Sequence, residues 1–394
     1  MRNQPDRKEP LVQLRQYRLR DEITIPRRSW LMPGMLMRKQ VAALVAAGGV
    51  GKSILSLTIA MHLCAGRNFG PWKTLDKYRI AVLSTEEDET ELDRRLHAIA
   101  KHYGFSQEDA DRLFLIQSGE EPVLARANNN GLIEATDLAR KMTYEAHQFE
   151  VDAVVLDPLI ELISVPENDN SAMKGAAALI REMARDLNAG VLLTHHTRKG
   201  STSPGDIDAS RGASSLAGLV RTAHTLMPMN ENEARSFGLD EEDAAGIFRC
   251  DSAKANYSAR SGRAHWFRFV TVTLDNADEH GGGDEIGVPV SWKGTSPLFE
   301  KSYAAITRVL KLIDAGNRDA DRYGFKRSGN SKRWVGLVIC DEWDCNDTQA
   351  GEIVDIWKAS GLLYEDNFEA SKSRGNRRGC FVDWSLNPDP EGPK

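Results

Sequence analysis

The feature that most constrains this chain is a glycine-rich stretch that directly follows a short apolar run. Residues 46–53 read A-A-G-G-V-G-K-S, and residues 41–45 before them read V-A-A-L-V. A strand, a glycine loop and a following helix together predict a phosphate-binding loop, because glycine lets backbone amides turn inward around an anion. The helix predicted over residues 52–65 would direct its N-terminal amides at the same anion. We therefore expect the β-phosphate of a nucleotide to contact Gly48, Gly49, Val50 and Gly51.

Two side chains of this stretch and one acid downstream predict a site for ATP and Mg²⁺. Lys52 would place its charge on the β- and γ-phosphates, and Ser53 would offer a hydroxyl to the metal. Residues 149–157 read F-E-V-D-A-V-V-L-D, an apolar strand that ends in an acid. Ligands of open α/β sheets bind at the carboxyl ends of the strands, so Asp157 is expected to hold the water shell of Mg²⁺.

A further carboxylate is needed to orient the water that attacks ATP. We expect it to follow the strand that lies beside the phosphate loop. Residues 80–85 are mostly apolar and lead into three acids, of which Glu86 is the first candidate and Glu87 the second. Asp88 and Glu89 are better explained as the start of a helix, where acids are favourable.

Two adjacent histidines end the apolar strand predicted over residues 190–195. A polar group at this place can sense the γ-phosphate and relay its loss, and His196 is the favoured candidate of the pair. The alternative is that both rings are satisfied by neighbouring carbonyl groups. A zinc site is disfavoured, because adjacent residues of a strand point to opposite faces.

Strands and helices alternate along the first half of the chain, which predicts an α/β fold with a mainly parallel sheet flanked by helices. The expected strands are 41–46, 80–85, 113–117, 152–157 and 190–195, and the expected helices are 52–65, 89–103, 134–147 and 171–188. More strands are expected near 220–228, 245–253 and 264–273, before a polar break at 276–283.

Net charge, cysteine spacing and the lack of long apolar stretches limit the classes of protein to which this chain could belong. The net charge is −6, so any contact with nucleic acid must come from local basic patches. The five cysteines lack metal-ligand spacing, and reduced thiols in a cytoplasmic protein are the simplest interpretation. No apolar signal region or membrane-spanning stretch is visible, so we expect no membrane association.

Taken together, the motifs resemble those of the plasmid RepA-type hexameric replicative helicases of the RecA-like superfamily. The resemblance covers residues 30–269 and depends on A-A-G-G-V-G-K-S, L-S-T-E-E-D, V-V-L-D-P, L-L-T-H-H-T-R-K-G, S-R-G-A-S-S-L and K-A-N-Y, in that order. The T-H-H-T-R-K-G and S-R-G-A-S-S-L segments are the most specific. Ala46 stands where a first glycine is usual, and Glu87 stands where members often carry aspartate.

The resemblance implies a RecA-like P-loop ATPase core and a homo-oligomeric ring, a hexamer, with ATP held between subunits. Lys52, Ser53 and Asp157 would bind ATP and Mg²⁺, and Glu86 would act as the base. Arg211 matches the arginine that family members insert into the neighbouring site, and Lys254 would assist from the same side. Such an arginine can accelerate hydrolysis by about 10³-fold or more.

In such rings, two loops line a central pore that holds single-stranded DNA. Here they are residues 158–171, which are acidic and apolar, and residues 197–210. Arg198 and Lys199 in the second loop are the candidates for contact with DNA phosphates. The alternative is a solvated basic pair.

The chain beyond residue 300 lies outside the resemblance. Helices are expected at 302–314, 334–343 and 348–360, followed by a hairpin with a basic tip, Lys372, Arg374, Arg377 and Arg378. This order predicts a small α+β domain, and a winged helix that contacts duplex DNA is one such arrangement. The alternative is a helical module for oligomerisation or partner binding. The expected domains are a flexible arm (1–28), the ATPase domain (29–298), the small domain (299–388) and a tail (389–394).

The leading hypothesis is an ATP-driven helicase or translocase on single-stranded DNA, acting in the replication of a plasmid, phage or mobile element. A second hypothesis is a replication initiator or regulator that uses ATP as a switch, without strong unwinding. A third is a RecA-like recombinase that forms filaments. The three differ in assembly: closed rings, site-specific duplex complexes or open helical filaments.

Overall fold

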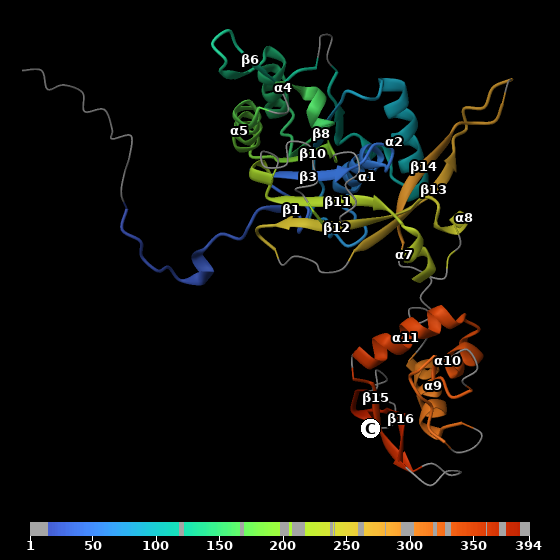
Figure 1. Cartoon of the computed structure of the whole chain (residues 1–394). Helices are drawn as coiled ribbons and strands as arrows, with labels where there is room; N and C mark the ends of the chain where they lie inside the picture. The colour runs from blue at the N-terminus through green and yellow to red at the C-terminus, as the bar shows by residue number, and fades with distance from the viewer. Residues whose placement is uncertain are drawn as a thin grey trace, which may run out of the picture.

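A nine-stranded sheet forms the centre of the part of the chain that the structure describes (Figure 1). Its parallel part runs in the order β11 (Thr222–Pro228), β3 (Val41–Ala46), β10 (Gly190–His196), β8 (Ala153–Asp157), β4 (Ile80–Ser84) and β5 (Leu113–Leu115). Antiparallel strands extend the sheet beyond β11: β12 (Ile247–Ala255), β13 (His265–Thr273) and β14 (Glu285–Trp292). The computed structural model describes residues 15–117, 122–165, 169–197, 205–206, 217–236, 239, 241–258, 264–279, 281–292, 303–317, 321–327, 332–359, 361–369 and 376–386.

Helices cover both faces of the parallel part of this sheet, which explains why strands such as β3, β8 and β4 are mostly apolar. All six residues of β3 are buried, and they alternate between two cores. One core packs α1 (Lys52–Ala65) and α2 (Glu89–Tyr103), and the other packs α4 (Asp137–Gln148) and α5 (Asn170–Asp186). A strand with buried side chains on both faces carries few polar residues, so its sequence is a nearly continuous apolar run.

Smaller elements flank the sheet. A hairpin of β1 (Trp30–Met32) and β2 (Leu36–Met37) precedes β3. A three-stranded sheet joins β6 (Ala125–Ala127), β7 (Ile133–Ala135) and β9 (Ile163–Ser164), and the turn η2 (Leu159–Leu162) leads from β8 into β9. The first half of the predicted pore loop 158–171 is therefore built into the fold. The short helices are α3 (Gln107–Ala110), α7 (Glu231–Ser236) and α8 (Glu241–Ala244), and η1 (Glu22–Thr24) lies in the N-terminal arm.

Residues from 303 onward form their own hydrophobic cluster. The helices α9 (Tyr303–Ala315), α10 (Gly336–Trp343) and α11 (Asp347–Ala359) precede an antiparallel pair, β15 (Leu363–Glu369) and β16 (Asn376–Val382), and the turn η4 (Trp384–Leu386). Val309, Ile339 and Leu363 lie at the centre of this cluster and are fully buried. The element order is the one that the sequence predicts for a winged helix.

The predicted fold class is confirmed: a mainly parallel α/β sheet with helices on both faces, and a small C-terminal α+β group. The predicted strand 41–46 and the helices 52–65 and 89–103 match the observed bounds. Strand β14 was not predicted, nor were the short strands of the small sheet. The five cysteines are free thiols, as expected. Every helix within the described ranges is too short or too polar to cross a lipid bilayer.

Candidate functional site

The loop between β3 and α1 has the backbone that an anion nest requires. Gly49 and Gly51 adopt positive φ angles of 78° and 95°, a region that side chains with a Cβ disfavour. A Cβ on Gly51 would also lie 2.4 Å from Cζ of Phe269 on β13. Gly51 caps α1 without a side-chain hydrogen bond, so the first amides of that helix remain directed at the loop.

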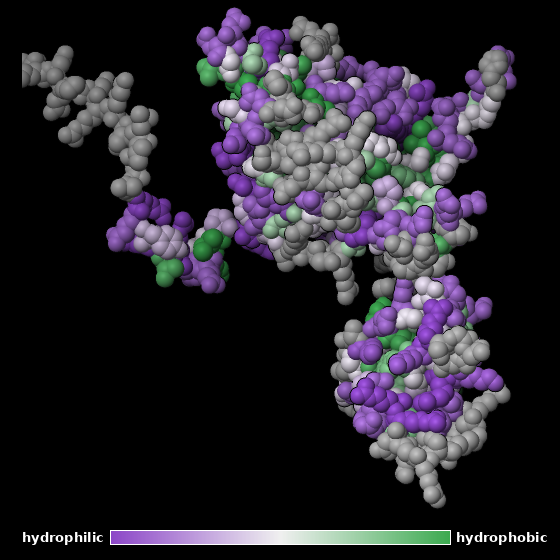
Figure 2. All heavy atoms as spheres, in the orientation of Figure 1, coloured by the Kyte–Doolittle hydropathy of each residue, from purple (hydrophilic) through white to green (hydrophobic). Residues whose placement is uncertain are grey.

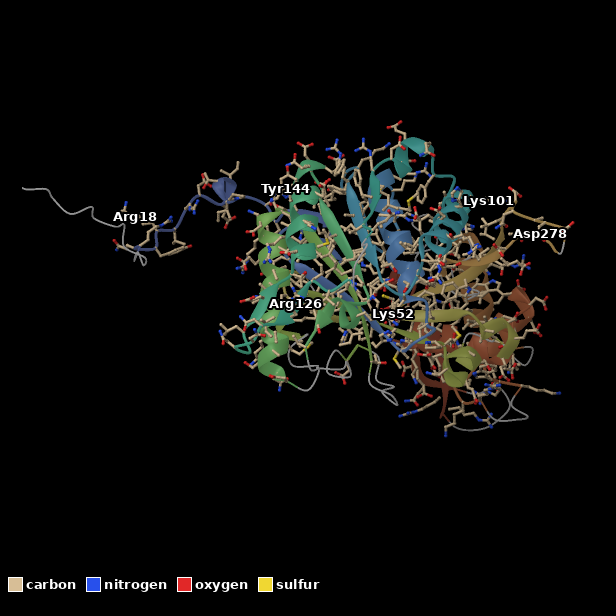
Figure 3. All side chains as sticks on the ribbon, turned by 90° about the horizontal axis from the view of Figure 1, so that it is seen from above. Arg18, Lys52, Lys101, Arg126, Tyr144 and Asp278 are labelled. Atoms are coloured by element: carbon tan, nitrogen blue, oxygen red, sulfur yellow. The ribbon has the colours of Figure 1, made fainter. Side chains whose placement is uncertain are left out.

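Lys52, the first residue of α1, is 5% exposed and lies against the loop (Figure 3). Its Nζ donates to the carbonyl oxygen of Ala47 at 3.1 Å and faces Nδ1 of His196 at 3.4 Å. Burial lowers the pKa of Lys52, while the nearby charges of Glu86 and Asp157 act in the opposite direction. The ammonium is thus held in a partly dehydrated position where a phosphate would gain most from it.

His196 joins Lys52 to Glu86. Its Nε2 lies 3.4 Å from Oε1 of Glu86, while Nδ1 faces the lysine. An ammonium can only donate, so Nδ1 must be the acceptor and Nε2 carries the hydrogen that faces the carboxylate. Its neighbour His195 is 1% exposed, so of the predicted pair only His196 reaches the site.

The predicted position of the strand before Glu86 is wrong. Strand β4 is not beside β3: β10 and β8 lie between them, and β10 and β11 are the neighbours of β3. Glu86 still reaches Lys52 and His196 because parallel strands end at one edge of the sheet, where their following loops converge. The structure places this carboxylate just after a strand end, as predicted. The predicted order of the strands is wrong.

Asp157 ends β8 and is 3% exposed. Burial raises its pKa, and hydrogen bonds from the hydroxyls of Thr194 and Ser53 oppose that rise. A buried carboxylate that faces a serine hydroxyl fits an Mg²⁺ site, since a cation would offset the cost of its burial. The described residues contain no cluster of three or more acidic, histidine or cysteine ligands.

One cavity of about 540 Å³ is lined by the loop glycines, Lys52, Ser53, Glu86 and His196, and Asp157 lies behind Ser53 outside this lining. The lining also includes residues that the sequence did not single out as functional: Glu91 and Arg95 on α2, and Glu285, Ile286 and Gly287 on β14. Arg95 binds Glu87 and Glu91, both at 2.8 Å. Burial raises the pKa of Glu87, and the charge of Arg95 opposes it. Glu87 is therefore committed to an ion pair, which leaves Glu86 as the carboxylate beside His196.

Other predicted residues lie elsewhere. Lys254 is on β12, where its Nζ donates to the carbonyl oxygen of Ala217, and the described lining of the cavity does not include it. Arg377 and Arg378 are exposed on β16. Outside the described residues lie Arg198, Lys199, Arg211, Lys372 and Arg374.

The comparison with known protein families agrees with this geometry. Residues 8–202 match the model of a family described as an AAA domain. The match includes the glycine loop, Lys52, Glu86, Asp157 and His196, and it ends before Arg211 and β14. Over these residues the chain is similar to that family, which supports a nucleotide-binding P-loop ATPase domain in this part of the chain.

Proposed function

We propose that this protein is an ATP-dependent helicase or translocase that acts on single-stranded DNA as a ring, with ATP hydrolysed at subunit interfaces, in the replication of a plasmid, phage or mobile element. One observation carries the proposal. The described lining of the nucleotide cavity supplies a lysine, a carboxylate and a histidine, but its arginine, Arg95, is bound to two acids. The cation that stabilises the transition state would then come from another subunit.

Each step of hydrolysis has a residue in the cavity. Lys52 attracts the β- and γ-phosphates, and the loop amides orient them. The hydrogen bond from His196 Nε2 occupies one oxygen of Glu86, so the other can align a water molecule and accept its proton. With ATP bound, Mg²⁺ would neutralise the phosphates, held by Ser53 and Asp157.

Loss of the γ-phosphate would first change the contacts of His196. The ring lies between the phosphate-binding lysine and the carboxylate, and it ends the strand that leads into residues 197–210. A change in the contact between Lys52 and phosphate would move the histidine, and with it the start of that loop. This supports a coupling between hydrolysis and the loop that carries Arg198 and Lys199.

The test mixes two inactive variants. Glu86→Gln should lower kcat about 10²- to 10⁴-fold with nucleotide still bound, and Arg211→Ala should lower it about 10³-fold. If the arginine acts across an interface, about a quarter of the interfaces in an equal mixture contain both intact residues, and activity returns. The control is each variant protein assayed alone. A mixture as inactive as its components would reject catalysis between subunits.

The DNA part of the proposal needs its own measurement. Single-stranded DNA should stimulate ATP turnover, and a forked duplex should be unwound. Reversing the charge of Arg198 and Lys199 should weaken single-strand binding and flatten its salt dependence. An ATP turnover rate that single-stranded DNA does not change at any salt concentration would reject the translocase hypothesis.

The exposed arginines of β16 favour a second candidate, an ATP-switched replication initiator or regulator. Arg378 is 76% exposed at its side chain and projects from the hairpin that would form the wing. This candidate predicts site-specific binding to duplex DNA with little unwinding. Imaging with a non-hydrolysable nucleotide separates both from the recombinase alternative, which predicts open filaments.

A further inference from the structure

The hydroxyl of Ser84, the last residue of β4, is buried without a hydrogen-bond partner among the described residues. Hydrophilic side chains dominate the visible surface of the molecule (Figure 2), where water can satisfy them, but Ser84 Oγ is closed off from solvent. A buried polar atom that forms no hydrogen bond costs free energy, and native proteins contain few such atoms. We therefore expect the partner of this hydroxyl to arrive with a ligand.

Ser84 lies directly beside Asp157. The parallel strands β4 and β8 pair these two residues, and the amide of Thr85 donates to the carbonyl oxygen of Asp157 at 2.9 Å. The hydrogen bonds between the strands thus continue to the ends of both, which fixes Ser84 and Asp157 side by side. Paired residues of parallel strands direct their side chains to the same face of the sheet.

That face of the sheet is the one that carries α1. Val82, two residues before Ser84, packs in the core that includes α1. Val155 stands two residues before Asp157 and packs in the same core. Because side chains alternate along a strand, Ser84 and Asp157 lie on this face too, near the N-terminus of α1, where Ser53 is the second residue.

Other hydroxyl groups already bind Asp157. Strand β10 pairs with β8 on the side away from β4, and the hydroxyl of Thr194 donates to Oδ1 of Asp157. The hydroxyl of Ser53 donates to the same carboxylate from α1. Hydroxyl groups thus surround the carboxylate from β4, β10 and α1. Of these, the Ser84 hydroxyl is the one that lacks a partner within the described part of the chain.

We propose that Ser84 is a positioning residue for the Mg²⁺ of the nucleotide site, and that its hydroxyl binds a water molecule of the metal's shell together with Asp157. The inference rests on the ATP-binding part of the proposed function. A metal-bound water molecule donates both of its hydrogens, so it can bind one oxygen of Asp157 and Ser84 Oγ at once. A buried water molecule needs roughly two to four polar partners, and this strand end provides them.

Ser84 Oγ is covered in this structure, so the water molecule enters only when the site changes. Lys52, which lies at the centre of Figure 3, here donates to the carbonyl oxygen of Ala47, and Ser53 donates to Asp157. With a nucleotide present, the lysine turns to the phosphates and the oxygen of Ser53 to the metal. That movement uncovers Ser84 Oγ beside the forming metal shell.

Nucleotide binding at a series of Mg²⁺ concentrations tests the assignment in the full-length protein. Ser84→Ala should raise the Mg²⁺ concentration for half-maximal binding of a fluorescent, non-hydrolysable ATP analogue about ten-fold, because groups that orient metal ligands contribute this much to affinity. Binding of the analogue in EDTA should equal that of wild type. Thr222→Val is the control: it removes a buried hydroxyl at the start of β11, bonded to Met35, and should change neither value.

Thermal unfolding gives a measurement that a purely structural role would not change in the same way. Without nucleotide, Ser84→Ala removes a buried hydroxyl without a described partner, so its midpoint temperature should equal or exceed that of wild type. With the analogue and Mg²⁺ at the half-maximal concentration of wild type, the order should reverse, because the variant gains less from the ligand. Thr222→Val should unfold below wild type in both conditions, because the carbonyl oxygen of Met35 loses its donor.

A second variant keeps the volume of the side chain. Ser84→Cys replaces the hydroxyl by a thiol, which is a weak acceptor, so it should lose metal affinity about as Ser84→Ala does. A dependence on Mg²⁺ equal to wild type in both variants overturns the role of Ser84. Equal weakening of analogue binding with Mg²⁺ and in EDTA also overturns it, because Ser84 would then support the phosphate loop and not the metal.

The outcomes for wild type separate this inference from the proposed function. Wild-type protein that binds nucleotide with Mg²⁺ but neither unwinds DNA nor responds to it would reject the translocase, while the loss of metal affinity in Ser84→Ala would still support the role of Ser84. Wild-type protein that binds no nucleotide overturns both.

Discussion

The nucleotide cavity and the C-terminal cluster hold their cationic side chains in different surroundings. In the cavity, Lys52 is 5% exposed, with Glu86 and Asp157 close enough to raise its pKa against the effect of burial. In the C-terminal cluster, guanidinium groups lie over aromatic rings: Arg322 over Phe381 at 4.4 Å, Arg327 over Trp334 at 5.3 Å, and Arg333 over Phe368 at 5.6 Å.

The difference separates a cation that is available to a ligand from cations that stabilise a fold. The dehydrated ammonium of Lys52 interacts strongly with a phosphate that enters the cavity. The stacked arginines already use their N–H groups inside the cluster: Arg322 donates to Asp314, Arg327 binds Asp347, and Arg333 donates to the carbonyl oxygen of Arg322. The exposed arginines of β16, Arg377 and Arg378, are therefore the cations of this region to test for contact with an anion.

The largest expected effect is at the cavity. Lys52→Ala should lower kcat/KM for ATP about 10³-fold, because the variant loses the buried lysine that faces the phosphates within the described lining of the cavity. The C-terminal cluster should keep its fold and its affinity for duplex DNA, if the two regions work as the comparison suggests. Steady-state turnover and a filter-binding assay measure both. Lys101→Ala, at a half-exposed lysine on α2, is the control, and turnover equal to that control would remove Lys52 from the site.

Acid should destabilise the ATPase region and spare the C-terminal cluster. Burial lowers the pKa of His62 and His224 from 6.5 to about 4, so the unfolded chain binds their protons more readily than the folded protein. Their stabilising contribution is full above pH 6.5 and is lost as the pH falls towards 4. The loss is about 3 kcal/mol for each histidine. No histidine occurs after His280, so the C-terminal cluster lacks this dependence.

Calorimetry between pH 7.5 and 4.5 checks this difference, with the two regions followed as separate transitions. The variant His62→Asn retains a donor for the carbonyl oxygen of Thr58 but cannot be protonated. The midpoint temperature of its unfolding transition should therefore fall less in acid than that of the wild type. His147→Gln, at an exposed histidine of α4, should behave as wild type. Equal acid sensitivity of His62→Asn and wild type would contradict the assignment.

The residues that the sequence identified share one property. Glu86, Asp157 and His196 lie at or just after the ends of strands, Lys52 follows the loop after β3, and strand ends of a parallel sheet meet at one edge. Local patterns therefore predicted that these residues lie at one edge of the sheet, without the order of the strands. The order of the strands was not predictable, because β4 and β10 have the same apolar character. The sequence of a strand does not determine which strand pairs with it.

The unpredicted part of the site depends on long-range packing. Arg95 and Glu285 occur within ordinary polar patterns, and only the folded chain brings them into the cavity. Strand β14 was missed because Gly287 and Pro289 weaken its pattern. Proline is tolerated there because β14 is an edge strand, where one side of the backbone needs no ladder partner.

The glycine loop allows a graded test of the cavity. Gly51→Ala should lower the free energy of unfolding by about 2–4 kcal/mol, since it combines a disfavoured φ with a clash against Phe269. Gly49→Ala has the positive φ but no clash, so it should lower the free energy of unfolding by about 1 kcal/mol. At Gly48 a Cβ meets no atom within 4 Å, so Gly48→Ala is the control. Urea unfolding measures the series, and equal stabilities would contradict the loop geometry.

The smallest expected effect is at the C-terminal surface. Arg377→Ala and Arg378→Ala should each weaken duplex binding a few-fold and reduce the slope of log K against log salt by about 1, if each contacts one phosphate. The effect is limited because Arg378 already binds Glu365 at 3.2 Å, and Arg377 lies 3.9 Å from Asp321, so part of each charge is neutralised before DNA arrives. ATP turnover without DNA should be unchanged, as should binding by Arg140→Ala, a control at an exposed arginine of α4. A salt slope that stays the same in both variants would make this cluster a protein-binding module and would assign DNA contact to the ATPase region alone.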